Sequence, residues 1–244
     1  MKTVAIIPSR YGSTRFEGKP LASICGRPMI QHVYEAAQRA TQIEQVVVAT
    51  DDARIIAAVE QFGGRAVMTS DEHRSGTDRV AAAAEALGLS LDDLVINVQG
   101  DQPLMDSRCL DEVVAPLVAD PELAMSTLAF RIVDFQEYTN PKDVKVVMDD
   151  RGYALYFSRA PIPYARDAGE RFDSFKHLGI YAYRRRFLDA FRQLPTGTLE
   201  GIEKLEQLRA MEYGHRVKVV VTRHDSPEVD LPSDIIRIEK MLQS

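Results

Sequence analysis

The chain has 244 residues, of which 45% are hydrophobic and 27% charged, and its formal net charge at pH 7 is −6. This composition is typical of a globular α/β enzyme, and the acidic balance disfavours nonspecific binding to nucleic acid. Two cysteines, Cys25 and Cys109, lack the CxxC spacing of a zinc site, which fits a reducing compartment. No apolar run approaches the ~20 residues that a membrane-spanning helix needs. We therefore expect a cytoplasmic protein without a signal peptide or membrane insertion.

The first half alternates short apolar runs with amphipathic helical patterns. This rhythm predicts a mostly parallel sheet with helices on both faces, a Rossmann-like α/β fold. The expected strands are Val4–Ile7, Val46–Ala49, Ala66–Met68 and Leu94–Val98, and the expected helices are Met29–Ala40, Ala53–Phe62 and Arg79–Leu87.

The second half reads as a smaller mixed or antiparallel element that ends in helices. Arg166–Phe172 has no apolar periodicity and is expected to be a mobile loop. The expected strands are Leu123–Ile132, Val144–Met148, Tyr153–Phe157, Leu178–Tyr183 and Val217–Thr222. The expected helices are Arg185–Leu194, Gly201–Tyr213, with Ile202, Leu205, Leu208 and Met211 in the core, and a terminal helix from about Ser233.

The loop after the first strand concentrates positive charge beside flexible backbone. Gly12 and Gly18 stand among Arg10, Arg15 and Lys19. Glycines let backbone N–H groups approach phosphate oxygens, and the cations neutralise their charge. The pattern is not a P-loop, because five residues separate the glycines and Pro20 stands where a Ser or Thr would bind magnesium. We interpret the loop as a polyanion site, with a solvated basic loop as the alternative.

Two aspartates follow strand-like segments in distant parts of the chain. Asp101 lies just beyond Leu94–Val98, and Asp230 precedes the terminal helix. Ligands bind at the carboxyl ends of strands in such folds, and carboxylates are preferred ligands of Mg²⁺. The two could clamp one cation, although each alone is equally typical of a turn or helix cap.

Two further groups of polar residues are candidate ligand contacts. Ser75-Gly76-Thr77-Asp78-Arg79 opens a helix, where free N–H groups can hold a base or a ribose, or simply cap the helix. Arg159, Lys176, His177 and Tyr181 stand near strand ends and suit a polyhydroxylated acid, while Glu206 on a later helix could reach a sugar or face solvent.

Taken together, these segments resemble the cytidylyltransferases that activate 3-deoxy-manno-octulosonate (Kdo). The resemblance spans nearly the whole chain in order. It rests on Ile7-Pro8-Ser9-Arg10, Gly18-Lys19-Pro20-Leu21, Val48-Ala49-Thr50-Asp51, Ser75-Gly76-Thr77, Val98-Gln99-Gly100-Asp101, Tyr153 to Arg159, His177 to Tyr181 and Leu205 to Arg209.

The resemblance implies a nucleotidyltransferase of the nucleotide-diphospho-sugar transferase type. CTP would bind, the anomeric hydroxyl of the sugar would attack the α-phosphorus, and pyrophosphate would leave, giving CMP-Kdo for lipopolysaccharide biosynthesis. It also implies one domain over 1–244, with 1–120 mainly binding nucleotide, 121–215 mainly binding sugar and dimerising, and 216–244 closing the fold. The expected partners are CTP, an octulosonate and a second copy in a homodimer.

The implied site residues follow from position. Arg10, Lys19 and Asp101 would be catalytic, and Asp101 and Asp230 would bind Mg²⁺. The nucleotide would meet Arg10, Ser13, Arg15, Lys19, Ser75, Gly76, Thr77 and Arg79, and the sugar would meet Gln99, Arg159, His177, Tyr181 and Glu206.

Two departures concern the identity of the sugar. Gln102 replaces the usual Glu of the family pattern, and Asp78 replaces the usual Glu of Ser-Gly-Thr-Glu-Arg. Both also occur in the branch that activates 8-amino-3,8-dideoxy-manno-octulosonate, so the sugar is expected to be Kdo or this 8-amino analogue. The alternatives are a sialate-type cytidylyltransferase and a non-catalytic nucleotide sensor.

Overall fold

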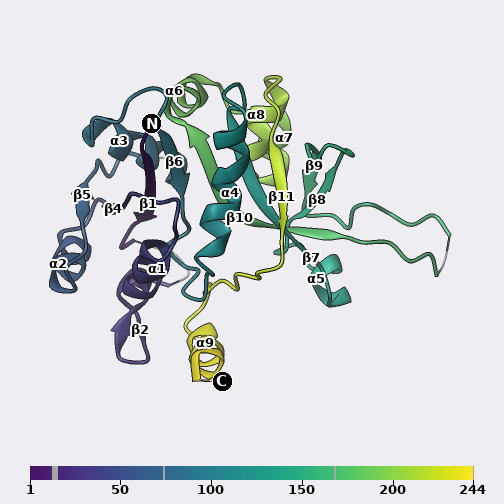
Figure 1. The fold of residues 1–244 in the computed structure, drawn as a ribbon. Helices are drawn as coiled ribbons and strands as arrows, with labels where there is room; N and C mark the ends of the chain where they lie inside the picture. The colour runs from purple at the N-terminus through teal and green to yellow at the C-terminus, as the bar shows by residue number, and fades with distance from the viewer. Residues whose placement is uncertain (13–15, 74, 168, 244) are drawn as a thin grey trace.

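The computed structural model describes residues 1–12, 16–73, 75–167 and 169–243. Its main sheet has the strand order β11-β7-β10-β6-β1-β4-β5, and β8 and β9 extend it beside β10 (Figure 1). The strands are β1 Thr3–Ser9, β4 Gln45–Thr50, β5 Ala66–Met68, β6 Leu94–Asn97, β7 Met125–Arg131, β8 Lys145–Met148, β9 Ala154–Ser158, β10 Phe175–Arg184 and β11 Lys218–Thr222. A separate hairpin pairs β2 (Ser23–Ile24) with β3 (Arg27–Pro28).

Strand directions confirm the expected fold class. β1 runs parallel to β4 and β6, and β4 runs parallel to β5, which makes the nucleotide-binding type of half-sheet. β10 is antiparallel to both β6 and β7, and β8 and β9 form an antiparallel pair. Because β10 reverses direction, its first residues lie at the same edge of the sheet as the carboxyl ends of β1 and β6.

Helices cover both faces of the sheet (Figure 1). They are α1 Met29–Gln38, α2 Ala53–Gln61, α3 Gly76–Ala86, α4 Arg108–Ala119, α5 Phe135–Thr139, α6 Arg185–Gln193, α7 Thr198–Glu203, α8 Gln207–Glu212 and α9 Asp234–Gln243, with a 3₁₀ turn, η1, at Lys19–Leu21. No helix in the part of the chain that the structure describes is long and apolar enough to cross a membrane.

The core has two layers, one on each face of the sheet. In β1, Ala5 and Ile7 pack into one layer and Val4 and Ile6 into the other. Strands that bury both faces read as continuous apolar runs, and this explains why Val4–Ile7 shows no polar alternation.

One sequence expectation for a helix was wrong. The single helix expected over Gly201–Tyr213 is two short helices, α7 and α8, separated where Lys204 takes a left-handed conformation (φ 55°). Ile202 is consequently 72% exposed rather than part of the core, whereas Leu208 is fully buried. The structure also contains α4, which the sequence reading did not predict although its Cys109, Leu110 and Val113 are fully buried.

A long arm joins β9 to β10 and extends away from the body of the molecule (Figure 1). Its described residues between 159 and 174 form neither helix nor strand. The loop expected to be mobile, Arg166–Phe172, lies in this arm, and its mobility stays a prediction. The C-terminal helix α9 packs against the body of the molecule, where Ile238 contacts Ile24 and Met29.

Candidate active site

The opening loop leaves β1 at the carboxyl edge of the sheet. Arg10 directly follows β1 and is exposed to solvent. Gly18 takes φ 68° and its N–H donates to the Tyr11 carbonyl oxygen at 2.9 Å, which closes the loop just before η1 begins at Lys19. A residue with a Cβ is disfavoured at this positive φ. Ser13 and Arg15 lie outside the described residues.

A close backbone approach places Asp101 beside the end of β1. A Cβ on Gly100 would lie 3.0 Å from Ser9 Oγ and 3.3 Å from the Pro8 carbonyl oxygen, so glycine allows this approach. Asp101, in the loop after β6, therefore lies beside the end of β1, where the cationic loop starts.

Three distant segments meet at Lys19. Its Nζ donates to Asp101 Oδ2 at 2.6 Å and to the carbonyl oxygen of Val229 at 2.9 Å. The Val229 N–H in turn donates to the Asp101 carbonyl oxygen at 2.9 Å. Asp230 directly follows Val229, and its Oδ2 lies 4.0 Å from Lys142 Nζ. The structure thus brings Asp101 and Asp230 into one site, with a lysine beside each carboxylate.

Two residues of this region were not among the predicted site residues. Gln102 is fully buried, and its Nε2 donates to the Leu178 carbonyl oxygen at 2.8 Å and to Glu228 Oε1 at 3.2 Å. Crowding by surrounding protein and the negative charge of Asp101 raise the pKa of Glu228 to about 7. The residue as a whole is exposed to solvent. The Glu-Val-Asp pattern at 228–230 was the available sequence signal.

The Ser75–Arg79 segment opens α3 beside β1. Ser75 Oγ accepts from the Asp78 N–H at 3.1 Å and caps the helix, and Gly76 lies against Pro8. Arg79 is buried, and its guanidinium donates to Asp51 Oδ2 at 2.6 Å and to Thr69 Oγ1 at 2.7 Å. Arg79 therefore holds the loops after β4 and β5 in place, whereas the start of the helix faces the site.

The predicted sugar residues His177 and Tyr181 flank a bulge in β10. Gly179 takes φ 68° there, and its carbonyl oxygen accepts from Gln99 Nε2 at 2.9 Å. Thr127 Oγ1 donates to the Ile180 carbonyl oxygen and lies 2.8 Å from His177 Nε2, so Nε2 carries the imidazole proton and donates to Thr127. Burial lowers the pKa of His177 to about 3, which makes the ring neutral at pH 7.

Glu206 joins the sugar residues to the nucleotide residues. Its carboxyl accepts from Thr77 Oγ1, and burial raises its pKa while the hydrogen bonds from Thr77 and Ser75 oppose that shift. Ser75 and Glu206 line a cavity of about 540 Å³. Among the described residues, Glu206 Oε1 is buried without a hydrogen-bond partner and lies 3.7 Å from Arg209 Nη2.

Arg159 contacts backbone carbonyl groups and none of the described site residues named above. Its Nε donates to the Glu203 carbonyl oxygen at 2.7 Å and its Nη1 to the Pro141 carbonyl oxygen at 2.9 Å. The guanidinium thus contacts carbonyl groups at the end of α7 and at Pro141.

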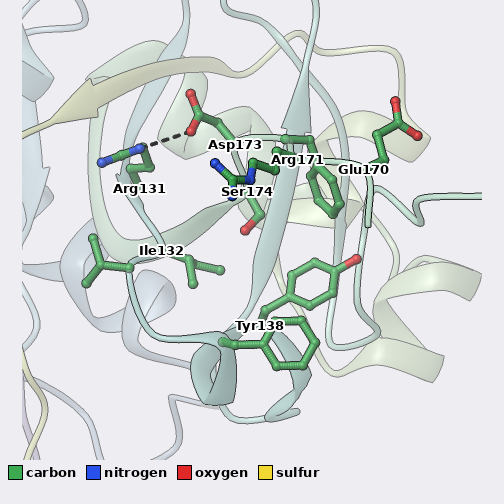
Figure 2. A pocket seen from close by; sticks show the side chains of 10 residues that line it. Arg131, Ile132, Tyr138, Glu170, Arg171, Asp173 and Ser174 are labelled. Atoms are coloured by element: carbon green, nitrogen blue, oxygen red, sulfur yellow. Dashed lines mark hydrogen bonds and ion pairs between the residues drawn. The ribbon is translucent and has the colours of Figure 1, made fainter. Parts of the chain in front are cut away.

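A second cavity of about 610 Å³ lies at the base of the arm. It is lined by Arg131 at the end of β7, by Tyr138 of α5 and by 170–174, and Arg131 pairs with Asp173 at 3.1 Å (Figure 2). None of the predicted site residues lines it.

Comparison with known proteins identifies the family. The profile of the family described as Cytidylyltransferase matches residues 4–219. The chain belongs to the cytidylyltransferase family. The 3-deoxy-manno-octulosonate cytidylyltransferase of Desulfosudis oleivorans is 64% identical over 100% of this chain and 98% of its own length. The 8-amino-3,8-dideoxy-manno-octulosonate cytidylyltransferase of Shewanella amazonensis is 55% identical over 100% and 99%.

Two solved structures are similar to this cytidylyltransferase. A CMP:2-keto-3-deoxy-manno-octonic acid synthetase solved with CTP superposes with a TM-score of 0.94 at 43% identity, over 100% of this chain and 99% of that one. A cytidylyltransferase from Leptospira borgpetersenii has a TM-score of 0.67 at 17% identity, over 100% and 87%, and shares the fold.

Proposed function

We propose that this enzyme transfers CMP from CTP to the anomeric hydroxyl of an octulosonate, Kdo or its 8-amino analogue, and releases pyrophosphate. The product would serve lipopolysaccharide biosynthesis, and the reaction would take place in the cytoplasm, where CTP is made. The observation that carries the proposal is the meeting of Lys19, Asp101 and Val229 at the carboxyl edge of the sheet. Relatives with the two octulosonate names support the choice of sugar.

The proposed nucleotide residues act by position and charge. Arg10 and Lys19, together with Arg15 and Ser13 of the same loop, neutralise and hold the triphosphate as charge develops on the leaving pyrophosphate. Ser75, Gly76 and Thr77 present the start of α3 to the nucleotide, and Arg79 positions the neighbouring loops. Residues 1–120 would carry most of this work and 216–244 would close the site through Asp230.

The proposed sugar residues are Gln99, Arg159, His177, Tyr181 and Glu206, and Arg159 also supports the segment 203–204. A neutral His177 with its proton fixed on Nε2 leaves Nδ1 as an acceptor for a sugar hydroxyl. Holding the anomeric oxygen in line with the α-phosphorus is the main catalytic contribution of such groups. In this division 121–215 would mainly bind sugar.

The carboxylates of Asp101 and Asp230 suit a hard divalent cation, and we propose Mg²⁺. Oxygen donors are the ligands that Mg²⁺ prefers, and Lys19 Nζ already places a positive charge against Asp101. When bound, the metal would supply charge neutralisation to phosphate oxygens.

A homodimer is part of the proposal. Large apolar side chains are exposed on α5 and the arm, with Phe135 74% and Tyr164 84% exposed. Such a patch fits a protein interface, and sedimentation of the purified protein would measure the mass of the assembly.

Pyrophosphate release in the presence of CTP and Mg²⁺ tests the reaction. Kdo, its 8-amino analogue and a sialic acid are supplied separately, with UTP replacing CTP as the nucleotide control. We expect release with an octulosonate and CTP only. Release with sialic acid alone would favour the sialate-type alternative, and nucleotide binding without release with any sugar acid would favour a sensor.

A further inference from the structure

The carboxyl group of Glu228 lies near the proposed site and has no role in the proposed reaction. Its Oε1 accepts from Gln102 Nε2 at 3.2 Å, and it lies close enough to Asp101 and Asp230 to feel their charge. Glu228 is exposed, whereas the amide that holds it is fully buried. It forms no ion pair with any residue in the described part of the chain. The result is a solvent-facing carboxyl group held by a fixed donor.

Glu228 is not placed as a third ligand of the cation. No three His, Cys, Asp or Glu side chains among the described residues are grouped closely enough to hold one metal ion. Asp101 and Asp230 each have a lysine nearby, at 2.6 and 4.0 Å, and Glu228 has none within ion-pair distance. Among the described residues the nearest positive charge acting on Glu228 is Lys19, which is already paired with Asp101, so a substrate cation can complement Glu228.

The chemistry of the sugar brings its far end toward this position. In the pyranose form the ring oxygen joins the anomeric C2 to C6, and C6 carries the C7–C8 chain. The C8 substituent therefore extends from the ring edge that also carries the anomeric carbon, and C4 lies at the opposite edge. Because the anomeric oxygen would reach the α-phosphorus beside Asp101, a group hydrogen-bonded to the neighbouring Gln102 is placed to read C8.

We propose that Glu228, oriented by Gln102, is a specificity-determining residue that pairs with an ammonium group at C8 and makes the enzyme favour the 8-amino octulosonate over Kdo. This inference rests on the proposed function. An ammonium offers three donors and a positive charge to the carboxylate, whereas the C8 hydroxyl of Kdo offers one neutral donor.

Gln102 acts in this pair as a positioning residue. Its Nε2 also donates to the Leu178 carbonyl oxygen at 2.8 Å, so the amide is fixed between the bulge of β10 and the 228–230 segment. A carboxylate at position 102 would set two like charges against each other, whereas the amide donates a proton to Glu228 and steadies it.

The test compares kcat/KM for the two sugars at saturating CTP and Mg²⁺. The unmodified enzyme is expected to favour the 8-amino sugar. Glu228→Gln should lower kcat/KM for that sugar by about 10- to 100-fold, as expected for a lost hydrogen bond to a charged group, and change kcat/KM for Kdo by less than about threefold. Gln102→Met, of similar volume, should shift the ratio in the same direction. Glu60→Gln on the exposed side of α2 is the matched control and should leave the ratio unchanged.

The Mg²⁺ concentration that gives half-maximal rate separates the two roles open to Glu228. An equal loss for both sugars together with a raised Mg²⁺ requirement would overturn the proposal in favour of a cation ligand. A preference for Kdo in the unmodified enzyme, or a ratio that Glu228→Gln does not change, would overturn the inference alone and leave the proposed function standing. Failure of the unmodified protein to release pyrophosphate with either sugar would overturn both.

Discussion

Lys19 contacts residues that are 82 and 210 positions away in the sequence. One ammonium group therefore neutralises Asp101 and fixes the backbone at Val229 at the same time. Its side chain is 16% exposed, so its charge acts in a region that water reaches only partly. Electrostatic effects are stronger in such a region than in bulk water.

Asp101→Asn is expected to lower kcat at least about 100-fold, because a neutral amide cannot replace a carboxylate that binds a cation. The backbone carbonyl that accepts from Val229 remains, so the free energy of unfolding should change little. Pyrophosphate release and urea unfolding measure the two quantities. Asp92→Asn, whose side chain is 73% exposed, is the control. Near-normal turnover in Asp101→Asn would refute the metal role.

Lys19→Ala is expected to reduce kcat more strongly than it raises KM for the sugar, because the charge it neutralises grows as pyrophosphate leaves. Steady-state rates at saturating CTP measure this difference. Lys240→Ala on α9 controls for loss of a surface cation. An unchanged rate at saturating CTP would contradict the proposed role.

Residue types and chain order identified candidate residues for the site. They did not identify the contacts that those residues make. Lys19, Asp101 and Val229 meet in the structure because strand ends in a parallel sheet share an edge, and their roles stay predictions. The sequence did not show that Arg79 pairs with Asp51 or that Arg159 serves carbonyl groups near 203. Those contacts depend on which charged partner the fold brings nearby, and residue spacing carries no information about this.

At the scale of elements, β10 is the strand that combines the two halves of the site. It lies between β6 and β7 and is antiparallel to both. The bulge at Gly179 turns the strand locally, and Gln99 from the end of β6 docks onto that bulge. Periodicity predicted this strand only from Leu178, because the bulge interrupts the alternation of the first residues.

Gly179→Ala is expected to cost about 1–2 kcal/mol of stability, since the left-handed conformation disfavours a Cβ. It should also raise KM for the sugar, because the bulge sets the positions of His177 and Tyr181. Gly214→Ala is a matched control, with φ 82° and open space around its Cβ position. It should lose similar stability and leave KM unchanged. If both variants change KM equally, the bulge has no specific role.

At the scale of the whole molecule, the alternation of strands and helices was sufficient to predict the layered α/β fold. The splitting of the Gly201–Tyr213 helix was not predictable from periodicity, because Lys204 is an ordinary helix former and takes φ 55° only in its tertiary context. α4 was missed although its apolar positions are buried, because Pro116 lies inside it and interrupts the expected pattern.

The stability of the whole fold is expected to fall as the pH drops from about 6.5 toward 3. The pKa of His177 is lowered to about 3 by burial, so in this range the unfolded chain binds a proton that the native state excludes. The free energy of unfolding then decreases by up to about 1.4 kcal/mol per pH unit from this group. Urea unfolding at pH 7 and pH 4.5 measures the change, and His177→Gln should flatten it. An unchanged slope in that variant would assign the acid sensitivity to other groups.

The tie between Val229 and both Lys19 and Asp101 also has a consequence for how the protein is made. Lys19 of the cationic loop is synthesised 210 residues before Val229. A nascent chain that has already formed the first half of the sheet still lacks the backbone carbonyl that steadies Lys19 and the second carboxylate. The full set of contacts around Lys19 and Asp101 therefore forms only after the 228–230 segment has been synthesised.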